Sequence, residues 1–431
     1  MKLNLGFGKD VVEVNITETN LLGVLEPNRI DLGLSGQEEV KRAIRDPIGT
    51  QRLKDIVKKD EKVVIITSDI TRPMPSKVVL LEIVNELREA NVELKNIKIV
   101  FALGCHRKHT EDEKRYLIGD ELYNQIECID SDGQDYVNMG ITSSGTPVDI
   151  FRPVAEADRR ICLGNIEYHY FAGYSGGIKA IMPGVSTRAA IQANHSKMVK
   201  DEAKAGEMLH NPVRRDIDEV ANFVTVDYIL NVVLDEHKTI IKAVAGHYLE
   251  AHRKGCLFLD KLYKAEIPER ADVVVVSPGG YPKDINLYQA QKALDNAKHA
   301  VKDGGVIVLV ASCIEGFGEK VFERWITNAQ HPEDLIEGIQ QNFELGGHKA
   351  AAIAMVLKKV DIYLVSELSD ETVRKVFMKP YTNVQTALDD AVKRTGENSK
   401  IIVMPFGGST LPEVVASGEN LNSVRTIGVE V

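Results

Sequence analysis

The sequence predicts an α/β fold of two α/β domains with mainly parallel sheets. At 431 residues the chain is long enough for two hydrophobic cores. Amphipathic stretches of helix length, such as 76–90, 248–262, 286–301 and 383–394, separate short apolar runs rich in β-branched residues. These runs are typical of inner strands of parallel sheets, which both faces bury, and they lie at 62–67, 97–102, 161–163, 271–276, 305–310, 360–364 and 400–404.

A charged, proline-bearing segment at 265–271 separates a helical pattern from a strand with four valines. Such segments are typical of domain boundaries. We therefore expect an N-terminal domain of residues 1–266 and a C-terminal α/β domain of residues 271–404. Residues 405–431, which contain a last apolar run at 424–429, are expected to rejoin the first domain.

Composition excludes several classes of protein. The formal net charge is −10, and no basic stripe interleaved with aromatic residues is present, which argues against nucleic-acid binding. No apolar run approaches the roughly 18 residues of a membrane span, so we expect a cytoplasmic protein without a membrane segment. The five cysteines are scattered and form no C-x-x-C pair, which argues against a disulfide framework and a thiolate zinc site.

Polar clusters follow the first three predicted strands. Ligands of open α/β sheets bind at the carboxyl ends of strands, so we expect the clusters to face one cleft. Arg72, whose backbone is stiffened by Pro73, could bind a carboxylate or phosphate through two hydrogen bonds, or it could pair with a surface acid while Asp69 caps a helix.

His106 could accept or donate a proton, or it could simply bond to backbone. We prefer it to a Cys105–His106 nucleophile pair because adjacent side chains on an extended segment point to opposite faces.

The stretch from His169 to Gly184 is the richest in candidate chemistry. Glycines at 173, 176 and 177 allow backbone N–H groups to turn toward an anion, with Lys179 close by. His169 and, at the end of a helical pattern, His195 supply imidazole for a metal or a proton. The alternatives are a surface lysine and a histidine stabilised by the helix dipole.

Ser175 lies in a G-x-S-x-G match, the nucleophile elbow of α/β hydrolases. An elbow needs a strand directly before the serine and a long helix directly after it. Pro183-Gly184 interrupts the chain eight residues later, and the preceding predicted strand ends near residue 163. The pattern therefore argues against a nucleophilic serine.

A glycine- and proline-rich turn at 277–284 leads from the valine-rich strand to a predicted helix. Gln289 and Lys292 lie three residues apart and share a face of that helix, next to Tyr288. These side chains either face a ligand or are ordinary surface residues.

Taken together, the motifs resemble those of the lactate racemase family. The resemblance covers both predicted domains and rests on Asp69-x-Thr-Arg72-Pro-x-Pro75, Gly104-x-His106-Arg107, His169-Tyr-Phe-Ala-Gly-x-Ser-Gly-Gly-x-Lys179, Pro183-Gly184, His195 and Tyr288-Gln289-x-x-Lys292. It implies a racemase or epimerase that inverts the Cα of lactate or a related 2-hydroxy acid, with the active site in the cleft between the domains. Hydride transfer to and from a nickel-pincer nucleotide, through a 2-keto acid, is the implied mechanism.

The resemblance also implies a role for each residue. Lys179 would bond covalently to the pyridinium-3-thioamide-5-thiocarboxylic acid mononucleotide, and His195 would complete the coordination of its nickel. His106 and His169 would be the paired acid/base residues. Enzymes that assemble the cofactor are implied partners. The remaining expected contacts are Asp69, Ser175, Gly176 and Gly177 to the cofactor, and Arg72, Lys292, Gln289 and Tyr288 to the substrate.

Three other functions stay open at this point. A metal hydrolase could use His106, His169 and His195 as a three-histidine zinc site. A serine hydrolase could use Ser175. A carrier protein could hold the nucleotide without turning over a substrate.

Overall fold

The chain forms two units in a computed structural model that describes residues 1–28, 30, 33–132, 134–235 and 237–415. Met1–Arg29 and Leu262–Val431 belong to the first unit, and Ile30–Lys261 form the second. This division differs from the predicted one because the N-terminal segment joins the C-terminal half. The predicted strand 424–429 lies outside the described residues, and β20 (Leu411–Val414) pairs in parallel with β14 (Lys264–Ile267), both in the first unit.

The second unit is built on a six-stranded sheet of order β13-β12-β9-β4-β5-β6. All neighbours are parallel except β12 and β13. The predicted mainly parallel α/β architecture is therefore confirmed for this unit. The strands are β4 (Val63–Ser68), β5 (Ile97–Ala102), β6 (Glu127–Asp130), β9 (Arg159–Asn165), β12 (Tyr228–Leu234) and β13 (Ile240–Gly246).

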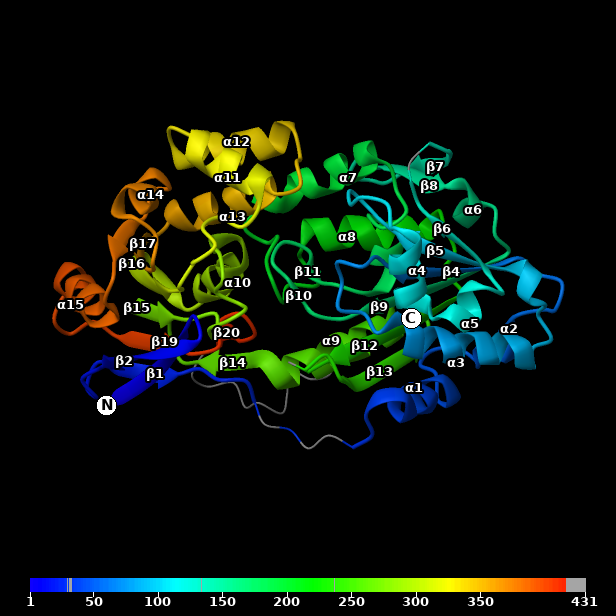
Figure 1. Ribbon diagram of the computed structural model, residues 1–431, viewed down its shortest axis with the longest axis horizontal. Helices are drawn as coiled ribbons and strands as arrows, with labels where there is room; N and C mark the ends of the chain where they lie inside the picture. Colours follow the sequence, from blue (N-terminus) through cyan, green and yellow to red (C-terminus); the bar gives the residue numbers. More distant parts are fainter. Residues whose placement is uncertain (29, 31–32, 133, 236, 416–431) are drawn as a thin grey trace. The chain divides into compact units, whose positions relative to one another are not determined.

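Helices cover the faces of this sheet (Figure 1). On one face, apolar side chains such as Val40 and Ile83 pack against strand residues such as Ile65 and Leu230 in a single buried cluster. On the other, the 3-10 helix η2 (Gly177–Ala180) contacts β9 and β4. The helices of the unit are α1 (Gly36–Arg45), α2 (Leu53–Ile56), α3 (Ser76–Glu89), α4 (Glu111–Ile118), α5 (Asp120–Tyr123), α6 (Arg152–Ala155), α7 (Arg188–His195), α8 (Pro212–Glu219) and α9 (Glu250–Tyr263), with 3-10 turns η1 (Leu94–Asn96), η3 (Ser196–Val199) and η4 (Val220–Asn222).

The first unit contains a second six-stranded sheet, of order β18-β17-β16-β15-β19-β3, and all its neighbours are parallel. Val274 and Val276 of β15 pack into one buried cluster, whereas Val273 and Val275 pack into another, so both faces are covered. This is why the strand reads as an unbroken apolar run. The strands are β3 (Leu21–Val24), β15 (Ala271–Val276), β16 (Val301–Val310), β17 (Asp361–Val365), β18 (Lys379–Tyr381) and β19 (Ile401–Met404).

Helices and the N-terminal hairpin cover this second sheet. Three of the helices, α11, α12 and α13, pack together (Figure 1). The helices are α10 (Leu287–Ala297), α11 (Lys320–Asn328), α12 (Pro332–Gln341), α13 (Gly347–Leu357), α14 (Asp370–Lys375) and α15 (Val384–Thr395). The predicted helices at 286–301 and 383–394 correspond to α10 and α15.

The antiparallel hairpin of β1 (Lys2–Phe7) and β2 (Asp10–Asn15) explains why the N-terminal segment belongs to the first unit. The Gly8 N–H donates to Asp284 Oδ2 at 2.6 Å, and the Gly8 carbonyl accepts from the Tyr281 N–H at 2.7 Å. A Cβ atom at Gly6 would lie 2.7 Å from the Gly279 carbonyl carbon. The hairpin thus packs closely on the glycine-rich turn after β15.

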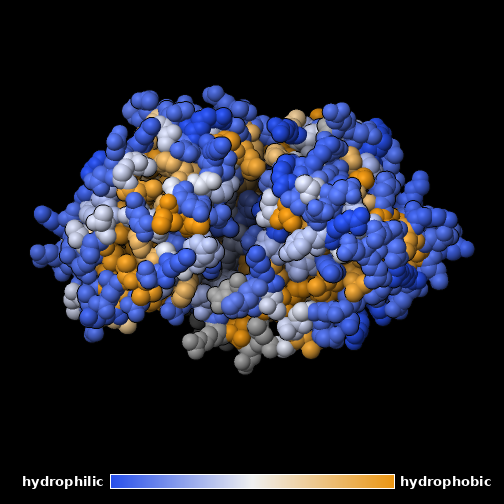
Figure 2. All heavy atoms as spheres, viewed as in Figure 1, coloured by the Kyte–Doolittle hydropathy of each residue, from blue (hydrophilic) through white to orange (hydrophobic). Residues whose placement is uncertain are grey.

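Two further hairpins belong to the second unit. They pair β7 (Tyr136–Ile141) with β8 (Pro147–Phe151) and β10 (Tyr168–His169) with β11 (Gly173–Tyr174). Hydrophilic residues dominate the visible surface, and hydrophobic ones appear in separate groups (Figure 2). Across the described residues, every helix is too short or too polar to cross a membrane.

Candidate active site

The predicted site residues of the second unit follow strands at the point where the order of its sheet changes direction. β4 has β5 as one neighbour and β9 as the other, so the connections that leave β4 and β9 diverge. Ligands of open α/β sheets bind at such a switch point. Asp69 directly follows β4, His106 follows β5, and His169 follows β9. The sequence-based placement of these three residues at strand ends is therefore correct.

His106 is paired with Asp69. The Nδ1 atom of the imidazole lies 2.6 Å from Oδ2 of the carboxylate, and both side chains are largely buried. Oδ1 of Asp69 accepts from the N–H and the hydroxyl of Thr71, at 2.7 and 2.5 Å. Burial alone would raise the pKa of Asp69, but the hydrogen bonds and the His106 charge outweigh it and lower that pKa. An ionised Asp69 places the His106 proton on Nδ1 and the lone pair on Nε2.

A second, buried histidine supports the turn that carries Asp69. Nε2 of His109 accepts from the N–H of Ile70 at 2.9 Å, and its Nδ1 lies 2.6 Å from Oδ1 of Asp130. Lys114 adds an ion pair to Asp130 at 3.3 Å. The sequence analysis missed both residues, although His109 lies three positions after His106.

His169 has the opposite hydrogen-bonding arrangement to His106. Its Nδ1 accepts from the Ala172 N–H at 3.3 Å, which leaves the proton of a neutral ring on Nε2. Burial, followed by the charges of Lys179 and Arg72, holds the pKa of His169 well below its ordinary value. His169 is therefore a neutral donor at physiological pH.

Phe171 connects His169 to His195. Its ring lies edge-on to both imidazoles, at centroid distances of 4.5 Å from His169 and 4.9 Å from His195. His195 is the last residue of α7, it is buried, and its Nδ1 lies 2.9 Å from Oδ1 of Asn194. The structure thus brings His169 and His195 together around one aromatic ring.

The glycine-rich turn is held from behind by two buried side chains that the sequence analysis missed. Arg214, fully buried on α8, donates from Nε to the Ala172 carbonyl at 3.2 Å and from Nη2 to the Tyr174 carbonyl. His252 of α9 donates from Nε2 to the Ser175 carbonyl at 2.8 Å. A charged residue in the apolar face of α8 is the only sequence signal for Arg214.

The glycines of the turn are required by both conformation and space. Gly173, Gly176 and Gly177 have φ values of 77°, 77° and 61°, a region that side chains disfavour. A Cβ atom on Gly177 would lie 2.9 Å from Cγ of His252. The Gly177 N–H donates to Oδ1 of Asn231 at 2.7 Å, whereas that of Gly176 donates to no described residue. Asn231, a lone amide in the apolar strand β12, was also missed.

Lys179 is a partly buried amine in cationic surroundings. Burial, followed by the charges of Arg214 and Arg72, holds the pKa of Lys179 well below its ordinary value. Among the described residues, its Nζ has no hydrogen-bond or ion-pair partner, and neither does the guanidinium of the exposed Arg72. A lowered pKa increases the fraction of the neutral, nucleophilic amine, so Lys179 is suited to a covalent bond with an electrophilic ligand.

Ser175 does not form a nucleophile elbow. Its hydroxyl donates to the Asn165 carbonyl at 2.7 Å and accepts from the Glu167 N–H at 2.9 Å. The two-residue strand β11 precedes it and the short η2 follows it. The serine is committed to backbone bonds, which contradicts the serine-hydrolase alternative.

The three-histidine zinc alternative also fails. Within the part of the chain that the structure describes, no three His, Cys, Asp or Glu side chains are grouped to hold one metal ion. His106, His169 and His195 therefore do not form a ligand triad. A metal bound by His195 must receive its other ligands from elsewhere.

Tyr288, Gln289 and Lys292 lie on α10 of the first unit, as predicted, and Gln289 and Lys292 are exposed. Lys349 of α13 holds the start of this helix, because its Nζ donates to the Tyr288 carbonyl at 2.6 Å and lies 3.8 Å from the centroid of the Tyr288 ring. The sequence analysis missed this buried lysine.

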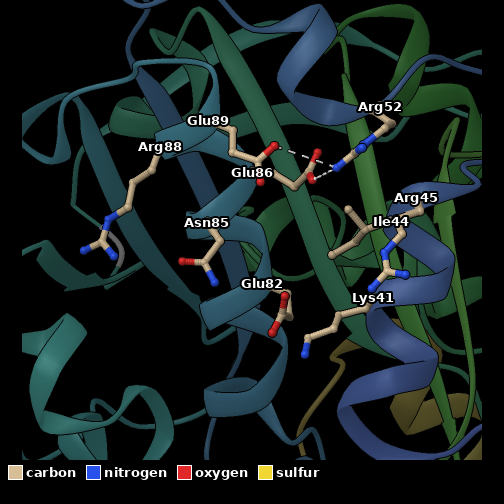
Figure 3. A pocket seen from close by; sticks show the side chains of 9 residues that line it. All are labelled: Lys41, Ile44, Arg45, Arg52, Glu82, Asn85, Glu86, Arg88 and Glu89. Carbon is tan, nitrogen blue, oxygen red and sulfur yellow. Dashed lines mark hydrogen bonds and ion pairs between the residues drawn. The ribbon is translucent and has the colours of Figure 1, made fainter.

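A separate hollow of about 480 Å³ lies between α1, the start of α2 and α3 (Figure 3). Among its charged side chains, Arg52 forms ion pairs with Glu86 and Glu89. None of the predicted site residues lines it. We interpret it as a surface ion-pair network.

Comparison with known proteins assigns the chain to a family. The family models for the lactate racemase N-terminal and C-terminal domains match residues 7–206 and 267–411. A lactate racemase from Thermoanaerobacterium thermosaccharolyticum is 34% identical over 95% of this chain and 98% of the relative, and one from Lactiplantibacillus plantarum is 31% identical over 94% and 98%.

Solved structures agree with this assignment. The lactate racemase apoprotein from T. thermosaccharolyticum superimposes with a TM-score of 0.86 at 33% identity, covering 96% of this chain and all of that one. A protein from Thermotoga maritima shares the fold, with a TM-score of 0.60 at 17% identity over 89% of this chain and all of that one. The chain therefore belongs to the lactate racemase family, and it is an isomerase of the racemase class.

Proposed function

We propose that this racemase inverts the Cα of a 2-hydroxy acid, lactate or a close analogue, by using a nickel-pincer nucleotide attached to Lys179. The environment of Lys179 carries the proposal: the amine has a lowered pKa, a glycine-rich turn precedes it, and no described residue pairs with it. The relatives named lactate racemase supply the substrate class.

The residues around Lys179 fit such a group. A thioamide nitrogen carries no charge, so it avoids the repulsion by Arg214 and Arg72 that a protonated amine would meet here. The Gly176 N–H, which donates to no described residue, would bond a phosphate oxygen, and the His195 imidazole suits nickel. When bound, such a group would supply a reversible hydride acceptor for the Cα hydrogen of the substrate.

His106 and His169 handle the hydroxyl proton of the substrate. Asp69 keeps the His106 lone pair on Nε2, where it can accept the proton, and stabilises the imidazolium that forms. His169 presents its Nε2–H as a hydrogen-bond donor to the substrate oxygen, and it acts as a proton donor when Nδ1 also holds a proton, so that loss of the Nε2 proton leaves a neutral ring. A racemase acts on two mirror-related substrates, so it needs proton handlers on both sides of the reacting carbon. The complementary states of the two histidines supply one acceptor and one donor.

Arg72 binds the substrate carboxylate, because its guanidinium is exposed and has no partner among the described residues. We propose Lys292, Gln289 and Tyr288 as further substrate-binding residues. The location of the site between the two domains remains a prediction from the sequence. Cofactor-assembly enzymes as partners and a cytoplasmic location are part of the same proposal.

The test is to produce the chain with and without cofactor-assembly enzymes and to measure intact mass, nickel content and racemisation of a panel of 2-hydroxy acids. We expect an adduct on Lys179, bound nickel and activity only with those enzymes. Lys179→Ala should lose the adduct, whereas His106→Ala should keep it and lose racemisation. An active protein that is unmodified at Lys179 and free of nickel would contradict the proposal.

A further inference from the structure

The side chain of Asn194 lies between His195 and a buried carboxylate. Asn194 is fully buried on α7, and its Oδ1 is the atom that faces Nδ1 of His195. Its Nδ2 donates to Oδ2 of Asp216 at 2.7 Å and to the Val213 carbonyl at 3.2 Å. Neither a carboxylate nor a carbonyl can donate, so the amide cannot be flipped without losing both bonds.

This fixed amide determines the tautomer of His195. Because Nδ2 is committed to Asp216, the oxygen must face His195, and an oxygen can only accept from Nδ1–H. The proton of the neutral ring is therefore on Nδ1, and the lone pair is on Nε2. A metal-binding histidine generally has its other nitrogen hydrogen-bonded in this way.

Asp216 is itself held by four donors. Its Oδ1 accepts from the Thr142 hydroxyl at 2.5 Å, and its Oδ2 accepts from the Thr146 hydroxyl at 2.7 Å and from Lys197 at 2.8 Å, besides Asn194. Asp216 is 1% exposed. Asp216, Thr142, Thr146 and Lys197 thus support one orientation of the Asn194 amide.

We propose that Asn194 and Asp216 are positioning residues that keep Nε2 of His195 available as a nickel ligand. The inference rests on the proposed function, because it assumes that His195 binds the nickel of the cofactor. Without Asn194 Oδ1 as an acceptor for Nδ1–H, the His195 ring can rotate or change tautomer. Loss of such a hydrogen-bond partner of a metal-binding histidine typically weakens metal binding by about 10- to 100-fold.

The first experiment follows nickel loss to a chelator from the loaded protein, with the Lys179 adduct measured in parallel by intact mass. Asn194→Leu should keep the adduct and lose nickel about 10- to 100-fold faster than the parent. Asn296→Leu is the matched control, since Asn296 is a buried asparagine on α10 that donates to the Gly407 carbonyl. It should lose nickel at the parental rate.

Unchanged nickel loss in Asn194→Leu, or equally fast loss in the Asn296→Leu control, would overturn the inference. A parent with neither adduct nor nickel would instead overturn the proposed function, and the inference with it.

A measurement on the protein without cofactor is independent of loading. Long-range ¹H–¹⁵N NMR of histidine-labelled protein, with the His195 signal assigned from His195→Gln, reports the tautomer directly. We expect Nδ1–H in the parent and a mixture of tautomers in Asn194→Leu. A His195 that is protonated on Nε2 in the parent would contradict the inference.

Discussion

Nδ1 of His106 lies 2.6 Å from Oδ2 of Asp69, and this bond joins the ends of two neighbouring parallel strands. The pair resembles the base and orienting carboxylate of hydrolytic triads, but Ser175, the serine of the elbow pattern, is committed to backbone bonds. Asp69 thus fixes the direction in which the His106 ring presents Nε2. This role differs from the cofactor contact that the family resemblance implies for Asp69.

Asp69→Asn should lower kcat by about 10²- to 10⁴-fold, the usual contribution of a positioned base. The amide can donate to Nδ1, which moves the proton of His106 to Nε2 and removes its lone pair there. Because the equilibrium constant between two enantiomers is one, kcat/KM must fall equally in both directions. Chiral assays that start from each enantiomer measure this, with nickel content and adduct as controls. Parental rates in the loaded variant would show that Asp69 does not orient the base.

Gly177→Ala should destabilise the protein more than Gly145→Ala. Both glycines have positive φ, 61° and 82°, so each substitution costs about 1–2 kcal/mol in backbone strain. Only at Gly177 does the new Cβ meet a neighbour, His252, which adds about 1–3 kcal/mol; Gly145 has nothing within 4 Å. Urea denaturation of the two variants measures the difference. Equal destabilisation would mean that the turn can move away from His252.

His252 should make the free energy of unfolding depend on pH. Burial and then the Arg214 charge hold the folded pKa of His252 well below its ordinary value of 6.5. Below pH 6.5 the unfolded chain therefore binds a proton that the folded chain does not, and the free energy of unfolding falls by about 1.4 kcal/mol per pH unit. His252→Gln should flatten the curve between pH 6.5 and about 5. His210 is exposed, so His210→Gln is the control and should leave the slope of the free energy of unfolding against pH unchanged. If His252→Gln also leaves that slope unchanged, His252 takes up its proton in the folded state.

Ser175 should not react with a fluorophosphonate probe, because its hydroxyl is bound on both sides by backbone groups. Ser175→Ala should lower the free energy of unfolding by about 1–3 kcal/mol, since it leaves the Asn165 carbonyl and the Glu167 N–H unsatisfied. Intact mass after probe treatment and denaturation curves check the two outcomes. Labelling that disappears in Ser175→Ala would restore the hydrolase alternative.

The sequence was sufficient to predict β4, β5, β9, β15, β16, β17 and β19 and the residues that follow the first three, but not β6, β12 or β13. Apolar runs such as 271–276 and the polar residues that follow them are local features, and the sheet order then brings Asp69, His106 and His169 to one edge. Strand pairing over long separations is not a local feature. Leu21 pairs with Ile401, and the hairpin tip at Gly8 bonds to Asp284, so no neighbouring residue indicates that the N-terminal segment belongs to the first unit.

The buried residues behind the site could not be predicted for a similar reason. Arg214, His252 and Asp216 lie on helices far along the chain from the turn and the histidine that they support. Their partners are backbone carbonyls or one amide, which carry no sequence signature. Two signals were usable: Arg214 is a charged residue in the apolar face of α8, and Asn231 is an amide in an otherwise apolar strand. A buried amide of this kind indicates that the side chain forms a hydrogen bond, but the sequence does not identify the partner.

The most direct test of the hydride mechanism is racemisation in D₂O by the loaded enzyme, starting from a single enantiomer of the preferred 2-hydroxy acid. If the Cα hydrogen leaves and returns as hydride, the racemic product keeps protium at Cα, as measured by NMR and mass spectrometry. Incorporation of one deuterium at Cα per inversion would show that the hydrogen leaves as a proton and would contradict the proposed function.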